Sequence, residues 1–103
     1  MSISTIKSLY KAHLKAAFPA SCCGRQVEGM DLMELDAAIA GCVQTFLSRR
    51  RLDPRRLCIL GIGYRFAHVA TRSGRPGARQ YFSRLERLAG AVLLEFAGRH
   101  AGE

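Results

Sequence analysis

The sequence predicts an all-α fold, a small up-and-down bundle of about four helices. Apolar residues recur at helical spacing in four segments, and short stretches rich in glycine and proline separate these segments. Aspartate marks two of the helix starts, as Asp31 and as Asp53 followed by proline. The predicted helices span residues 2–18, 31–51, 54–72 and 76–97. With 103 residues, the chain 1–103 has the length of a single helical domain.

The charge of the chain favours an anionic partner. Lysine and arginine together number 16 and aspartate and glutamate 8, which gives a formal net charge of +8. A surplus of this size suits nucleic acid, an acidic protein or an anionic membrane surface, although it also serves solubility without any partner. Net charge bears on association and not on fold, so both interpretations stay open at this point.

No stretch of the sequence approaches the roughly 18 consecutive apolar residues that a membrane span requires. Lys7, Lys11 and Lys15 interrupt the region where a signal peptide would have its apolar core. We therefore expect a cytoplasmic protein that does not enter a membrane. Its four cysteines are then expected to be reduced, because Cys42 and Cys58 fall inside apolar helical patterns where a thiol packs as a small hydrophobic group.

Segment 2–18 is amphipathic. Ser2 or Ser4 can cap its start, and Pro19 follows its end. Its three lysines recur every four residues on one side, which is typical of a solvated face and needs no ligand to explain it. Residues 19–30 show no periodicity and are expected to form a loop.

The stretch SRRRLDPRR, residues 48–56, joins the second predicted helix to the third. Arg49 and Arg50 lie at the C-terminal end of the second helix, where the helix dipole favours cations. Arg55 and Arg56 lie in the first turn of the next helix, where the dipole disfavours positive charge. Those two arginines need another reason for their position. All four are candidates for binding an anion or an acidic partner.

Segment 54–72 allows two interpretations. Residues 57–64 are apolar and partly β-branched, as in a strand, and Gly61 and Gly63 each disfavour a helix by about 1 kcal/mol relative to alanine. The strong cap at the start and the lack of a partner strand favour a helix. The two glycines lack the rest of a dinucleotide-binding motif, and a close approach by another helix explains them as well.

As a helix, this segment has two apolar faces. The first consists of Leu57, Leu60, Tyr64 and Ala67. A helix with a second apolar face either lies at the centre of the core or contacts another chain. We therefore expect a homodimer formed through the second face. The residues of this predicted self-association face are Ile59, Ile62, Phe66 and Val69.

Segment 76–97 carries a broad apolar stripe and a polar face. The basic part of the polar face consists of Arg79, Gln80, Arg84 and Arg87. These residues gather as on a nucleic-acid recognition helix, although Glu86 and Glu95 lie among them as on a solvated face. No aromatic residue is interleaved with the arginines, which disfavours stacking on single-stranded bases and leaves contact with a phosphate backbone.

Signs of metal binding or catalysis are weak. Cys22 and Cys23 are adjacent, which is poor geometry for two ligands of one ion, and neither C-x-x-C nor H-x-x-x-H occurs. A pair of loop thiols is the simpler interpretation, with a redox or metal role left open. His13 and His68 lie on apolar faces, where we expect a buried histidine bonded to a backbone carbonyl. We expect no cofactor and no enzymatic activity, because no nucleophile, base and orienting group stand together.

These observations favour a non-enzymatic protein-interaction module. We expect a small helical protein that forms a homodimer through its third helix and binds another protein, an acidic one by the sign of its own charge. A bacterial regulator, adaptor or immunity-type protein would fit this description by size and class. The alternative is a basic dimeric protein that binds nucleic acid through the phosphate backbone.

Overall fold

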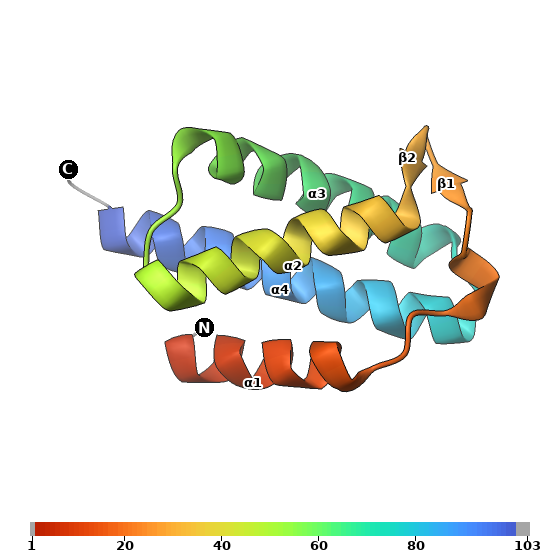
Figure 1. Ribbon diagram of the computed structural model, residues 1–103, viewed down its shortest axis with the longest axis horizontal. Coiled ribbons are helices and arrows are strands. Elements are labelled where there is room, and N and C mark those ends of the chain that lie inside the picture. Colours follow the sequence, from red (N-terminus) through yellow and green to blue (C-terminus); the bar gives the residue numbers. More distant parts are fainter. Residues whose placement is uncertain (1, 101–103) are drawn as a thin grey trace.

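The computed structural model describes residues 2–100 and confirms the predicted all-α fold (Figure 1). Four helices run alternately in opposite directions and form an elongated bundle with extents of 42 × 26 × 19 Å. Helices α3 and α4 share the most extensive contact, and α1 packs mainly against α4. In Figure 1, α1 and α3 lie at opposite edges of the bundle, with α2 and α4 between them. The helices are α1 (Ile3–Lys15), α2 (Leu32–Arg49), α3 (Pro54–Ser73) and α4 (Pro76–His100).

Side-chain caps start three of the helices, as predicted. The Ser2 hydroxyl accepts the backbone N–H of Thr5 at 3.2 Å. The carboxylate of Asp31 accepts two N–H groups of the first turn of α2. The carboxylate of Asp53 accepts the N–H of Arg56 in the first turn of α3 at 2.8 Å. Because each aspartate satisfies orphan backbone donors, it fixes the residue at which its helix begins.

Residues 57–64 belong to α3, which settles the choice between helix and strand in favour of helix. Gly63 is buried in this helix, and a Cβ built there would lie 2.8 Å from Cγ1 of Ile39 on α2. The absence of a side chain at this position lets the two helices approach closely. Gly61 has open space instead, so only one of the two glycines serves the packing.

The segment between α1 and α2 is more ordered than the loop that the sequence predicts for residues 19–30. It contains a 3-10 turn (Ala20–Cys22) and a hairpin of two short antiparallel strands, β1 (Gln26–Val27) and β2 (Met30–Asp31). Both residues of the hairpin turn have positive φ, 51° at Glu28 and 82° at Gly29, as a type I′ turn requires. The hairpin packs against α3 and so covers part of its surface.

Two helix ends differ from the predicted ends by three residues, and the other ends differ by two residues or fewer. Helix α1 stops at Lys15, three residues early, because Ala16 is extended and the chain turns toward Pro19. Phe18, which the prediction placed in the helix, instead packs edge-on against the rings of Tyr81 and Phe82. At the other end of the chain, α4 continues to His100, past the predicted end at residue 97.

The core lies between the four helices and takes its largest side chains from α2 and α4. Its fully buried members share aliphatic or aromatic side chains that exclude water from the centre of the bundle. They include Ile6, Leu35, Ile39, Val43, Phe46, Leu60, Phe82, Leu85, Leu88 and Val92.

Candidate interaction surfaces

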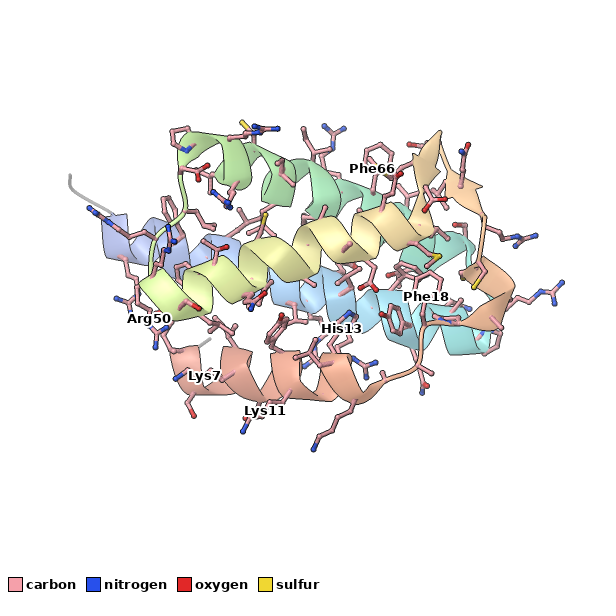
Figure 2. All side chains as sticks on the ribbon, in the orientation of Figure 1. Lys7, Lys11, His13, Phe18, Arg50 and Phe66 are labelled. Carbon is pink, nitrogen blue, oxygen red and sulfur yellow. The ribbon has the colours of Figure 1, made fainter. Side chains whose placement is uncertain are left out.

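The outer face of α3 carries the predicted self-association residues. Ile62 is 53% exposed and Ile59 is 36% exposed. Phe66 and Val69 are half-buried, since the β1–β2 hairpin covers this end of α3, as Figure 2 shows for Phe66. Ile62, Phe66 and Val69 line a mostly apolar hollow of about 360 Å³. The face therefore combines protruding isoleucines with a hollow beside them.

The same face carries charges of both signs. Glu28 at the hairpin turn and Arg65 of α3 both line the hollow and are both exposed. Neither side chain has an ion-pair partner among residues 2–100. The sequence of α3 itself contains arginine but no aspartate or glutamate, so Glu28 is supplied to this surface by the hairpin.

At the end of α2, the structure separates the roles of the predicted arginines. Arg50 takes the left-handed conformation that closes the helix, with φ 57°, and its guanidinium donates to the carbonyl oxygen of Leu47. The cation therefore meets the negative end of the helix dipole, as predicted. Arg49 is exposed and lines a shallow surface hollow with Arg51 and Arg56.

An ion pair explains why Arg56 lies in the first turn of α3, where the helix dipole disfavours a cation. Its guanidinium forms an ion pair with the capping residue Asp53. The pKa of the Asp53 carboxyl is lowered, first by the backbone N–H of Arg56 and then by its guanidinium. Arg55, by contrast, is exposed, and its side chain has no partner among the described residues. Of the two arginines, Arg55 remains the candidate for an external anion.

The predicted basic face of α4 gathers at one hollow. Arg79, Gln80, Arg84 and Arg87 line it together with Thr71, Pro76 and Ser83, and its volume is about 710 Å³. The two acidic residues that the sequence places among them turn to other partners. Glu86 accepts from Nδ1 of His68 on α3 at 2.9 Å, and Glu95 lies 3.8 Å from Nε of Arg99. No carboxylate lines this hollow.

Arg84 is the most constrained cation of this hollow. Its guanidinium carbon lies 5.9 Å from the centre of the Tyr81 ring, within the range of a cation–π contact. Its Nε is buried, and no acceptor among the described residues bonds to it. The side chain is thus held at the edge of the core with one donor unused.

The prediction that His68 is a core histidine bonded to a backbone carbonyl was wrong. Its side chain is 51% exposed and bonds to the Glu86 carboxylate. The position lies at the margin of the core-facing side of α3, where an imidazole can reach solvent and the neighbouring helix together. A carboxylate on α4 supplies the partner that the sequence pattern of α3 alone does not show.

His13 is buried, 3% exposed, but its partner is a side chain and not the expected backbone carbonyl. Its Nε2 lies 2.7 Å from Oδ1 of Asp36 on α2, and Figure 2 shows the ring pointing from α1 into the bundle. The Tyr81 hydroxyl donates to the other oxygen of Asp36 at 2.6 Å. Burial and this hydrogen bond raise the pKa of Tyr81. One carboxylate therefore joins α1, α2 and α4.

No sequence pattern predicted this polar cluster. Asp36 follows the core residue Leu35, and Tyr81 lies on the apolar stripe of α4. The signal for it in the sequence is a carboxylate at the edge of an apolar stripe, because such a group needs a hydrogen-bond donor from a facing helix.

All four cysteines are free. Cys42 is buried as expected, its thiol donates to the Arg56 carbonyl oxygen at 3.6 Å, and burial raises its pKa. The prediction that Cys58 is packed in an apolar environment was wrong, because Cys58 faces solvent on the outer side of α3. Cys22 is buried and its neighbour Cys23 is exposed. In the part of the chain that the structure describes, no three histidine, cysteine or acidic side chains are grouped as metal ligands.

No helix among residues 2–100 has the length and apolar character needed to cross a bilayer. No family model matches the chain, and neither the curated proteins nor the solved structures yield a match. The assignment of a function therefore rests on the surfaces themselves.

Proposed function

We propose that this protein is a non-enzymatic protein-interaction module that forms a homodimer through the outer face of α3. The observation that carries the proposal is the exposed Ile62 beside the apolar hollow that it lines with Phe66 and Val69. A two-fold contact places the same patch of both copies together, so a surface with a protrusion and a hollow side by side can complement itself. Burial of these isoleucines removes apolar surface from water on both copies.

The charges on the face support a second copy as the occupant. Arginines alone on α3 would repel across a two-fold axis, but Glu28 adds an acidic group to the same surface. In a two-fold contact across the hollow, Glu28 of each copy meets the arginines of the other. Opposite charges that have no partner within one chain then find one in the dimer.

The direct test replaces Ile62 by a charged residue. We expect Ile62→Glu to weaken dimerisation by about 30-fold or more, because the contact would bury an unpaired charge at its centre. Leu94→Glu is the matched control, since Leu94 is 72% exposed on α4 and lies outside the proposed interface. Sedimentation velocity over a concentration series measures both variants against the unmodified protein. A monomeric unmodified protein at all concentrations, or equal dissociation of the two variants, would contradict the proposal.

The dimer also presents arginines to a partner protein. Arg49 and Arg55 are exposed near the α2–α3 junction and have no ion pair among the described residues. Arg55 lines a hollow with Ile59 and so lies at the edge of the proposed dimer face. We propose that a protein rich in carboxylates binds there, because most acidic side chains of the chain itself are already engaged in caps and ion pairs. The four free cysteines support a reducing compartment, the cytoplasm, as the place of action.

The second candidate function is nucleic-acid binding through the phosphate backbone. It is favoured by the net charge of +8 together with the collection of Arg79, Arg84 and Arg87 at one hollow. Backbone contacts of nucleic-acid-binding proteins come from such side chains.

A further inference from the structure

We propose that the hollow along α4 is a binding site for the phosphate backbone of duplex nucleic acid, with Arg79, Arg84 and Arg87 as its cations. This inference rests on the second candidate function, and it names the site and the mode of recognition. The hollow lies on α4 and the adjoining end of α3, and the self-association residues do not line it. Both surfaces can therefore act at the same time.

The first argument is that the fold keeps acidic side chains out of the hollow. Glu86 lies next to Arg87 in the α4 sequence, but the fold directs its carboxylate to His68 of α3. Glu95 lies about two helical turns beyond Arg87. The hollow is therefore lined by cations, hydroxyl groups and an amide without a carboxylate. A polyanion that enters it meets no repelling group among the lining residues.

Arg84 provides the second argument. Its guanidinium lines the hollow, and the Tyr81 ring holds the group in place. A phosphate oxygen seated in the hollow would accept from the terminal N–H groups of this guanidinium. Arg84 therefore loses little side-chain freedom when it binds a charged ligand, and this lowers the entropic cost of binding.

The shape of the hollow distinguishes nucleic acid from smaller or more apolar ligands. From Arg79 to Arg87 the helix rises about 12 Å, which spans several phosphates of one strand and exceeds a single phosphate ion. The other donors are the amide of Gln80 and the hydroxyl of Ser83, and Pro76 is the one apolar lining residue. A peptide partner would find little to anchor its apolar side chains. No aromatic side chain lines the hollow for base stacking, so the backbone is the recognised feature.

The test measures binding of a fluorescent 20-base-pair DNA duplex by anisotropy as a function of salt concentration. For the unmodified protein, the logarithm of the association constant should fall linearly with the logarithm of salt concentration. We expect Arg79→Gln with Arg87→Gln to reduce the slope by about 2, one for each lost phosphate contact. The matched control is Lys7→Gln with Lys11→Gln, which removes the same charge from the outer side of α1 (Figure 2) and should leave the slope unchanged.

A separate variant tests the orientation of Arg84. Arg84→Lys retains the charge but removes Nε and the planar guanidinium, so we expect an unchanged salt slope with binding about 10-fold weaker. Binding as strong as that of the unmodified protein would overturn the role assigned to the Arg84 guanidinium.

The outcomes separate failure of the site from failure of the function. If the unmodified protein does not bind the duplex at 50 mM salt, nucleic-acid binding itself is wrong. If it binds and the arginine and lysine double variants share one slope, DNA binds elsewhere and the site is wrong. A polyglutamate peptide that binds as tightly as the duplex would also overturn the proposal, in favour of an acidic protein.

Discussion

At the scale of single residues, the side chain of Asp36 on α2 connects three helices. Its two carboxylate oxygens accept from His13 of α1 and Tyr81 of α4, and the rings of these partners lie 4.6 Å apart. A partly buried carboxylate is costly without donors, so both contacts help to keep it in the bundle. The loss of the His13 donor therefore weakens the attachment of α1, and the loss of the Tyr81 donor weakens the contact between α2 and α4.

Tyr81→Phe isolates one of these contacts. We expect a loss of about 1.5 kcal/mol in the free energy of unfolding at neutral pH, because a hydrogen bond to a charged group is removed from a partly buried site. Urea denaturation measures it, with Tyr64→Phe as the control, since the Tyr64 hydroxyl has no hydrogen bond among the described residues. Equal stability of the two variants would contradict the role of Asp36.

The same variant changes the response to high pH. The pKa of Tyr81 is raised in the folded state, so the folded protein favours the neutral phenol. The stability from this group is present below the unfolded pKa of about 10 and is lost as the pH rises toward the folded value. Tyr81→Phe should lack this part of the alkaline destabilisation.

The sequence predicts some single-residue roles and not others, and the distinction is physical. The caps at Ser2, Asp31 and Asp53 depend on neighbours a few residues away, so local sequence determines them. The environment of His68 depends on Glu86, 18 residues along the chain, and no pattern within α3 reports it. Partners brought together only by helix packing lie beyond this kind of prediction.

Among the helices, α3 has two sides with different surroundings. Its inner side packs closely against α2 through Gly63, and its outer side exposes Ile59 and Ile62. The periodicity of its apolar residues predicted both sides, except that Tyr64, which it assigns to the inner side, is 38% exposed. The partial cover by the hairpin was not predicted, because strands of two residues are too short to show alternation and the Glu28–Gly29 turn is not among the strong hairpin signals.

The two glycines of α3 form a matched pair for a test of this packing. Gly63→Ala places a methyl group against Ile39 and should destabilise the protein by about 1 to 3 kcal/mol. Gly61→Ala meets no neighbour within 4 Å and should stabilise the helix by up to about 1 kcal/mol. Chemical denaturation of both variants measures the difference. Stabilisation by both substitutions would show that α2 and α3 are not in close contact at Gly63.

For the whole molecule, the arrangement of the helices exposes an apolar surface on α3 and a basic surface on α4. The edge position of α3 leaves Ile59 and Ile62 exposed on its outer side. On α4, three arginines gather at one hollow that no carboxylate lines. Helix number and approximate bounds followed from periodicity and caps. The grouping of side chains into two hollows did not, because it depends on how the hairpin and the helices meet in space.

The most direct test of self-association exchanges the charges on the α3 face. Glu28→Arg and Arg65→Glu each place like charges opposite one another in the proposed two-fold contact, so each variant alone should be monomeric. An equimolar mixture restores opposite charges at both positions and should form a dimer in sedimentation velocity. Dimers of either single variant, or a mixture that stays monomeric while the unmodified protein is dimeric, would contradict dimerisation through this face.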